Sequence, residues 1–188
     1  MVDFATNQFK SGLKVLIDND PYSILQNEYV KPGKGQAFNR VKLRNLKTGR
    51  VIDKTFKSGD KLPGADVNES EMTFLYADDD FYYFMDAVSY EQKPATYAAA
   101  EQVIGWIKDG DACTVTTFNG DILLVEPPNF VELRITECEP SVKGDTVSGG
   151  SKEATLETGK VIRVPLFVNE DEIIKIDTRS GDYVSRVK

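Results

Sequence analysis

Short runs of alternating apolar and polar residues dominate the chain, and turn-forming residues separate them. In the first third the runs cover residues 14–18, 22–30, 37–46 and 51–57, with segments rich in Asn, Pro and Gly between them. Alternation with a period of two is typical of half-buried strands, and a rhythm of short strands is typical of small antiparallel barrels. We therefore predict a small β-barrel for this third.

The middle third predicts a second β-rich domain with one helix. Its strand-like runs cover residues 71–77, 81–86, 112–118 and 121–126. We interpret residues 95–107, ATYAAAEQVIGWI, as a single helix. Asn119 and Gly120 stand between the last two runs, and Asn-Gly in that position is a strong signal for a tight β-hairpin.

The last third is expected to be all β. Its apolar runs cover residues 130–138, 160–168, 172–178 and 182–187. Arg179, Ser180 and Gly181 are predicted to turn the final hairpin. Residues 139–159 are rich in Gly, Ser and Thr, and we interpret them as a loop longer than a structural connection needs to be. Long loops of this kind often bind a partner.

Two proline-containing segments suggest the domain boundaries. KLPGADVN at 61–68 and EPPNF at 126–130 resemble short, stiff linkers, because proline restricts both itself and the preceding residue. We therefore expect three domains, at residues 1–64, 65–127 and 128–188. No apolar run approaches the roughly 18 residues of a membrane span, and no signal peptide precedes the first domain, so we expect a cytoplasmic protein without a membrane partner.

The charge differs sharply between these three segments. Residues 1–64 contain 12 Lys+Arg and 6 Asp+Glu, whereas residues 65–127 contain 2 and 13, and residues 128–188 contain 9 and 11. The first segment therefore carries +6 and the second −11, within a chain of net charge −7. A basic segment in an acidic protein suggests an anionic partner for that segment alone.

Several catalytic chemistries are disfavoured by the residues present. The chain has no histidine, which removes the commonest general base and the commonest metal ligand. Cys113 and Cys138 form no CxxC motif, so we expect no zinc, redox pair or cofactor. Asp78, Asp79 and Asp80 are compatible with a cation site, but three acids between strands are more typical of a solvated turn, and we assign them no catalytic role.

The segment VKPGKGQAF at 30–38 holds Lys34 between two glycines. It is not a phosphate-binding Walker A loop, because Glu28 occupies the required first glycine position and no Ser or Thr follows the lysine. One interpretation is an ordinary solvated hairpin tip. The other is a slim tip, stiffened by Pro32, that places Lys34 in a narrow polyanionic space.

The strand after this tip places three cations on one face. Arg40, Lys42 and Arg44 alternate with Val41 and Leu43, so the two sets point to opposite sides. Such alternation is ordinary for a half-buried strand. Together with the lysines of the tip, the row also fits a surface that follows a phosphate backbone.

The segments KPGKGQAFNRVKLRNLKTG and KTFKSGDK closely resemble the first domain of bacterial elongation factor P. Further motifs resemble the same family in the same order: GADV, FLYADDDFYYFMD, PPNFVELRI, KGDTVSGGSKEATLETG, VPLFV and IDTRSGDYVSRVK. The resemblance extends over essentially the full length. One departure is Asp171, which stands where the family pattern has a glycine, so the geometry of that turn is in question.

The resemblance implies a mainly β fold of three small β-barrel domains in an elongated L shape, an SH3-like or KOW-like barrel followed by two OB-folds. It implies a monomeric elongation factor, not an enzyme, that mimics tRNA and binds the ribosome between its peptidyl and exit sites. There it relieves stalling at consecutive prolines by stabilising the peptidyl-site tRNA. Its partners would be ribosomal RNA, ribosomal proteins and that tRNA.

The resemblance also assigns site residues. Lys34 is expected to be modified by an enzyme that attaches β-lysine, and in some relatives by a hydroxylase, because a longer arm carrying amines reaches further along RNA. Its loop comprises Lys31, Pro32, Gly33, Gly35 and Gln36, and Arg40, Lys42 and Arg44 are candidates for RNA contact. Gly144, Asp145, Thr146, Gly149 and Gly150 are candidates for a loop at the exit-site codon.

Two alternatives remain open from the residues alone. A general single-stranded RNA-binding protein built from OB-folds would use aromatic residues as stacking platforms. Its candidates are Phe74, Tyr76, Phe81, Tyr82, Tyr83 and Phe84, although the charge of −11 around them repels a phosphate backbone. An enzyme with Lys34 as base or nucleophile is the weaker alternative, because a bare tip offers no desolvation.

Overall fold

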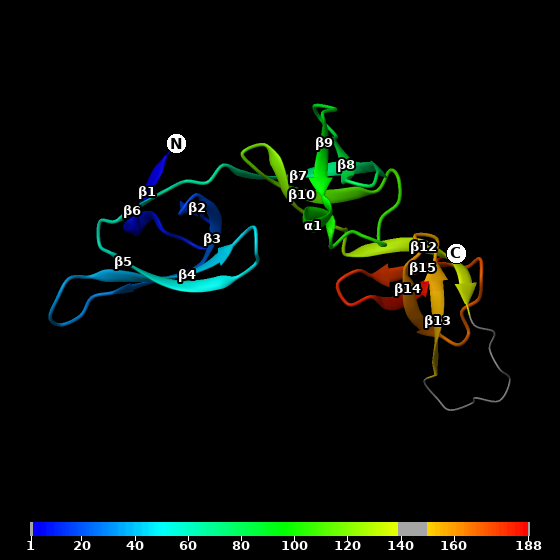
Figure 1. Ribbon diagram of the computed structural model, residues 1–188. Coiled ribbons are helices and arrows are strands. Elements are labelled where there is room, and N and C mark those ends of the chain that lie inside the picture. The colour runs from blue at the N-terminus through cyan, green and yellow to red at the C-terminus, as the bar shows by residue number, and fades with distance from the viewer. Residues whose placement is uncertain (1, 139–149, 188) are drawn as a thin grey trace. The chain divides into compact units, whose positions relative to one another are not determined.

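The computed structural model describes residues 2–138 and 150–187 and is built mainly from antiparallel strands (Figure 1). The described chain divides into two compact units. The first comprises the residues up to 69 together with 116–124, and the second comprises 70–115 and the residues from 125 onward. The mainly β architecture agrees with the prediction from alternation. The exact domain boundaries at 64/65 and 127/128 stay predictions.

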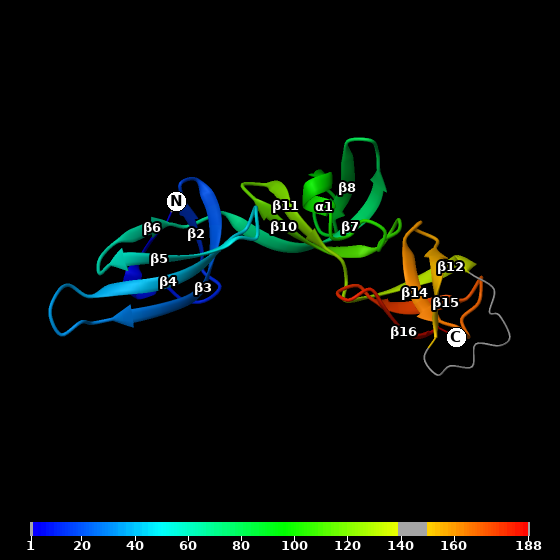
Figure 2. The same cartoon turned by 60° about the horizontal axis from the view of Figure 1, so that its bottom comes forward.

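The first unit contains a four-stranded sheet in the order β2-β3-β4-β5 and a two-stranded sheet of β1 and β6. The strands are β1 (Asp3–Ala5), β2 (Lys14–Ile17), β3 (Asp20–Val30), β4 (Phe38–Asn45), β5 (Val51–Lys57) and β6 (Lys61–Pro63), with a 3-10 turn at Thr6–Gln8. One apolar core holds these strands together, made of Phe9, Val15, Ile17, Ile24, Val41, Leu43 and Phe56. The long β3–β4 hairpin projects from this part of the chain (Figure 2).

The middle third forms a five-stranded sheet in the order β11-β10-β7-β8-β9. Its strands are β7 (Val67–Ala77), β8 (Phe81–Asp86), β9 (Gln92–Thr96), β10 (Ala112–Phe118) and β11 (Asp121–Glu126). Asn119 and Gly120 connect β10 to β11 with φ angles of 51° and 92°, which confirms the predicted Asn-Gly hairpin.

The helix predicted over residues 95–107 is much shorter in the structure. Only α1 (Tyr97–Ala100) is helical, and Thr96 caps it by accepting a hydrogen bond from the Ala99 amide. The residues after it form tight turns, in which Val103 N donates to Ala100 O and Trp106 N to Val103 O. Gly105, at φ 76°, is incompatible with a continuing helix. The run of alanines indicated the start of the helix but not its end.

The last third forms a five-stranded sheet in the order β14-β13-β12-β15-β16. Its strands are β12 (Phe130–Cys138), β13 (Ser151–Leu156), β14 (Val161–Pro165), β15 (Ile173–Asp177) and β16 (Asp182–Arg186). The turn after β15 contains Gly181 at φ 78°, as expected for the final hairpin.

Two expectations for this domain are tested by the structure. The interpretation of 139–159 as one loop was wrong at its end, because β13 lies there with Lys152, Ala154 and Leu156 facing inward. At the position of the family glycine, Asp171 adopts φ 65° and its amide donates to Ile135 O at 2.9 Å. The turn therefore forms with an aspartate in the left-handed region, which Asp tolerates better than most residues.

Candidate nucleic-acid interface

The candidate site begins with the loop of residues 31–37 between β3 and β4. The strand ladder ends at the pair Val30 and Phe38, so the loop extends beyond the last cross-strand contact. Lys34 is exposed, as are its two glycine neighbours and Gln36. A Cβ atom on Gly33 would meet nothing within 4 Å, and one on Gly35 would meet only the Pro32 ring at 3.8 Å. The tip is therefore slim and open, which fits both interpretations of the sequence.

Gly35 is the position where the loop needs a glycine for its backbone. Its φ of 111° lies in a region that residues with a side chain rarely adopt. Gly33 has no such requirement. The two glycines thus serve different purposes, since Gly35 permits the turn whereas Gly33 keeps bulk away from Lys34.

A buried amide network fixes the base of the hairpin. Asn39 on β4 is 3% exposed, and its Nδ2 donates to Asn27 Oδ1 on β3 at 2.8 Å. Asn27 Nδ2 in turn donates to the Phe9 carbonyl at 3.0 Å. Just beyond the loop, the Ser58 amide donates to Ala37 O. Hydrogen bonds between buried and half-buried side chains therefore hold the base on which the tip stands.

Sequence reasoning missed this network, although a signal was present. Asn39 shares a strand face with Val41 and Leu43, which are both fully buried. A polar amide therefore interrupts the otherwise apolar face of this strand. A buried amide needs hydrogen-bond partners, because leaving it unsatisfied costs about 1–3 kcal/mol. A polar residue on a core face would thus have indicated a structural hydrogen bond.

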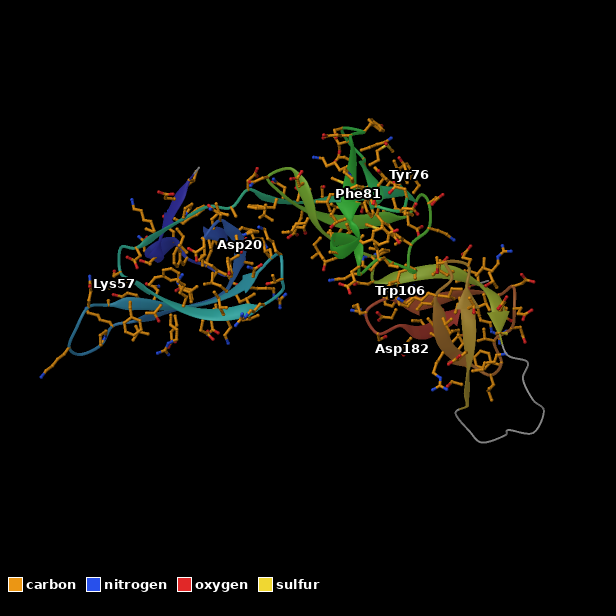
Figure 3. The ribbon with its side chains drawn as sticks, viewed as in Figure 1. Asp20, Lys57, Tyr76, Phe81, Trp106 and Asp182 are labelled. Carbon is orange, nitrogen blue, oxygen red and sulfur yellow. The ribbon has the colours of Figure 1, made fainter. Side chains whose placement is uncertain are left out.

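The predicted cation row is confirmed as a surface feature. Arg40, Lys42 and Arg44 are exposed, on the face of β4 opposite to the buried Val41 and Leu43. Lys57 of β5 lies opposite Phe38, near the base of the loop (Figure 3).

Two acids lie among these cations, which the linear sequence did not reveal. Strand register places Glu28 opposite Arg40, and the Arg40 guanidinium lies 3.6 Å from the Glu28 carboxylate. Asp53 of β5 lies opposite Lys42. Both side chains of the Arg40–Glu28 pair are more than half exposed, so the pair contributes at most about 1 kcal/mol and leaves the arginine available to another anion.

The second candidate loop lies mostly outside the described residues. Gly144, Asp145, Thr146 and Gly149 belong to that segment. Gly150 is described and exposed, and a Cβ atom there would lie 2.7 Å from Leu166 Cδ1. Close packing against Leu166 is thus a sufficient reason for glycine at this position.

The aromatic residues of the middle third do not form one stacking platform. Phe74 and Phe84 are 6% and 0% exposed and belong to the core of the sheet. Phe81, Tyr82 and Tyr83 are half-buried, and Tyr76 is 47% exposed. Core packing therefore explains some of these rings, as expected from the acidic charge around them, but leaves Tyr76 unexplained.

The acidic turn at 78–80 and the thiol of Cys113 have structural explanations. Asp78 accepts hydrogen bonds from the amides of Asp80 and Phe81 in its own turn. The described residues contain no cluster of three or more potential ligands arranged to hold a metal ion. Burial, with a smaller effect of Asp111, raises the pKa of the Cys113 thiol to about 12, so this thiol is unreactive at neutral pH.

The described residues include no helix that is both long and apolar enough to cross a lipid bilayer.

Comparison with protein families assigns each third of the chain. Residues 5–62 match the elongation factor P KOW-like domain, residues 67–125 the elongation factor P OB domain, and residues 131–186 the elongation factor P C-terminal domain. Three β domains in this order define a translation factor and not an enzyme. The chain belongs to the elongation factor P family.

Two solved structures share the fold at low sequence identity. Eukaryotic translation initiation factor 5A from Methanococcus jannaschii is 21% identical, with a TM-score of 0.52, over 66% of this chain and 95% of its own. A translation initiation factor 5A family protein from Naegleria fowleri is 16% identical, with a TM-score of 0.54, over 66% of this chain and 97% of its own. At these identities the likeness concerns the fold alone.

Proposed function

We propose that this chain is a monomeric cytoplasmic elongation factor that binds the ribosome between its peptidyl and exit sites. There it relieves stalling at consecutive prolines, because Lys34 stabilises the acceptor end of the peptidyl-site tRNA. The observation that carries the proposal is an exposed lysine on a glycine-flanked tip, raised on a hairpin whose base is fixed by buried Asn39. Family membership supports a role in translation.

The chemistry required of the factor is positioning. Prolyl donors and acceptors adopt poor geometry for peptide bond formation, and holding two reactants in line removes much of the entropic cost of the reaction. A slim tip reaches a crowded site without steric conflict, and a cation at its end binds phosphate or hydroxyl groups of RNA. The ribosome supplies the catalytic groups.

Modification of Lys34 belongs to the same proposal. An attached β-lysyl group lengthens the arm and adds an amine, and the open space around Gly33 and Gly35 leaves room for a modifying enzyme to reach the lysine. The exposed position of Lys34 also fits a substrate better than a catalytic base, which needs desolvation.

The functional test is a reporter with three consecutive prolines, translated in a reconstituted system that contains no such factor. Adding this protein, purified from its native cells, is expected to restore full-length product while leaving a proline-free reporter unchanged. If the stall persists although the Lys34 modification is present, the proposed function is wrong. Tight binding of random single-stranded RNA without ribosomes would then favour the general RNA-binding alternative.

The cation row is tested separately by charge reversal. Ribosome association of the double variant Arg40→Glu, Lys42→Glu is expected to weaken and to lose part of its salt dependence, because fewer counterions are released on binding. The matched control is Lys10→Glu, Lys61→Glu, which changes the charge equally at exposed positions of the same unit. An unchanged salt slope in the first variant would remove the row from the contact surface.

A further inference from the structure

The outer face of strands β7, β8 and β9 carries an aromatic row that the proposed function does not use. Strand register places Tyr76 opposite Tyr83 and Tyr83 opposite Pro94. The neighbouring positions Phe84 and Ala95 are both 0% exposed, so they point into the core while the row points outward. Phe81 and Met85 share the outer face of β8 with Tyr83, and both are half-buried.

A β-bulge is the reason that Tyr76 faces outward. The register between β7 and β8 shifts between Phe74 and Tyr76. Without that shift Tyr76, two residues after the buried Phe74, would point into the core, because side chains two apart on a regular strand share a face. The extra residue turns Tyr76 to solvent, where 47% of it is exposed.

The exposed rings are held in a fixed arrangement. The Tyr76 and Tyr83 rings stack with centroids 4.6 Å apart and an angle of 24°, and Phe81 meets Tyr83 edge-on at 6.4 Å. The Tyr83 hydroxyl donates to Asp78 Oδ2 at 2.9 Å, and the Tyr97 hydroxyl donates to the Asp78 carbonyl at 2.8 Å. Figure 3 labels Tyr76 and Phe81 on these strands. A pre-ordered surface binds at a lower entropic cost.

The charge around the row determines which partner fits. Asp79 and Asp80 are exposed in the turn that joins β7 to β8, and in the part of the chain that the structure describes neither carboxylate forms an ion pair. The surrounding segment, residues 65–127, carries −11. A phosphate backbone is repelled by this field, whereas a cationic side chain is attracted both by the carboxylates and by the faces of the tyrosine rings.

We propose that this face, centred on Tyr76 and Tyr83 and bordered by Asp79 and Asp80, docks an arginine- and lysine-rich segment of a partner protein. Arginine stacks on aromatic faces and pairs with carboxylates at the same time. Exposed tyrosine in a fixed position is a common anchor of protein interfaces. The face lies in the second unit and does not depend on the role of Lys34.

The test uses the full-length protein and a fluorescent 12-residue peptide of alternating Arg and Gly, with binding followed by fluorescence anisotropy. Tyr76→Ala is expected to weaken binding about three- to fivefold, because it removes the stacking ring but no charge. Tyr76→Phe keeps the ring and is expected to bind within about twofold of wild type. Tyr29→Ala, which removes a 60% exposed tyrosine from the first unit, is the matched control and is expected to change nothing.

A separate variant tests the contribution of the two carboxylates to peptide binding. Asp79→Asn with Asp80→Asn is expected to weaken peptide binding and to flatten its salt dependence, since exposed charges are screened by salt. Equal binding by wild type and Tyr76→Ala would show diffuse attraction to an acidic protein and would overturn the proposal. So would undetectable peptide binding, or tighter, Tyr76-dependent binding of oligouridylate, which would assign the face to RNA.

Discussion

The loop after β3 and the turn after β7 connect antiparallel strands, yet they present their side chains in opposite ways. Residues 31–37 expose Lys31 and the glycine-flanked Lys34, and within the described chain they form no side-chain hydrogen bond. Residues 78–80 are acidic, and Asp78 binds two amides and the Tyr83 hydroxyl. The loop at 31–37 leaves the Lys34 side chain free to extend and to be modified. The turn at 78–80 instead holds the neighbouring Tyr83 ring in a fixed position.

The two proposed roles account for the composition of the loop at 31–37 and of the turn at 78–80. A tip that enters a confined RNA site gains from small residues and a flexible cation, because bulk would clash and rigidity would prevent adjustment. A docking face gains from rings in one defined position, because ordering them on binding would reduce affinity. Electrostatics separates their partners, since the first segment carries +6 and the middle segment −11.

The largest expected effect comes from disturbing the turn of the tip and adding bulk to it. Gly35→Val places a branched side chain at φ 111° and next to Lys34, and we expect at least a tenfold loss of stall relief on a three-proline reporter. The matched control is Gly49→Val in the β4–β5 turn, where φ is 71° and open space surrounds the residue. Both variants should lose stability through backbone strain, on the order of 1–3 kcal/mol each. Equal activity of the two would show that tip shape does not matter.

The next largest effect is a loss of stability when the hydrogen bonds at the base of the β3–β4 hairpin are removed. Asn39→Ala removes the donor to Asn27 and leaves that side chain partly unsatisfied, so we expect the free energy of unfolding to fall by about 1–3 kcal/mol. Urea denaturation measures the change. A loss below about 0.5 kcal/mol would mean that water replaces the bond and that the base is not fixed by this network.

The smallest effect is a shift in proton binding at the acidic turn. Hydrogen bonds from the amides of Asp80 and Phe81, and then from the Tyr83 hydroxyl, lower the pKa of Asp78, and the bond to Asp78 raises the pKa of Tyr83. Asp78→Asn should therefore move the Tyr83 pKa down toward its ordinary value of 10.0, as read from ring NMR shifts.

The same bonds set the acid response of the turn in the wild type. Because the folded pKa of Asp78 is lowered, its stabilising contribution is complete above the ordinary value of 3.8 and is lost as the pH falls through the lowered pKa. The Asn variant should lack this component of acid unfolding. A Tyr83 pKa that does not respond to Asp78→Asn would contradict the fixed arrangement of the turn.

The strands and their faces could be predicted because alternation is a direct consequence of strand geometry. Val41 and Leu43 inside, with Arg40, Lys42 and Arg44 outside, needed no tertiary information. The exposed Lys34 tip followed from its glycines and proline. The Asn119-Gly120 hairpin followed from the preference of that pair for positive φ.

The failures arose where tertiary contacts override local pattern. Strand β13 was missed because Lys152, a residue type expected at the surface, is 5% exposed there. The outward Tyr76 depends on a bulge that no local signal announced. Likewise, Glu28 and Asp53 reach the cation row through strand register, so their sequence separation from Lys42 hid them. Each error concerns a relation between segments and not a segment itself.

The most direct test of the account compares Lys34→Ala with native protein in the three-proline reporter assay, together with the mass of the peptide that contains Lys34. The matched control is Lys10→Ala, at an exposed position of the same unit. We predict that native protein and the Lys10 variant relieve the stall, that Lys34→Ala does not, and that the native peptide carries the added mass of a β-lysyl group. Relief by Lys34→Ala equal to that by native protein would contradict the central role of this lysine.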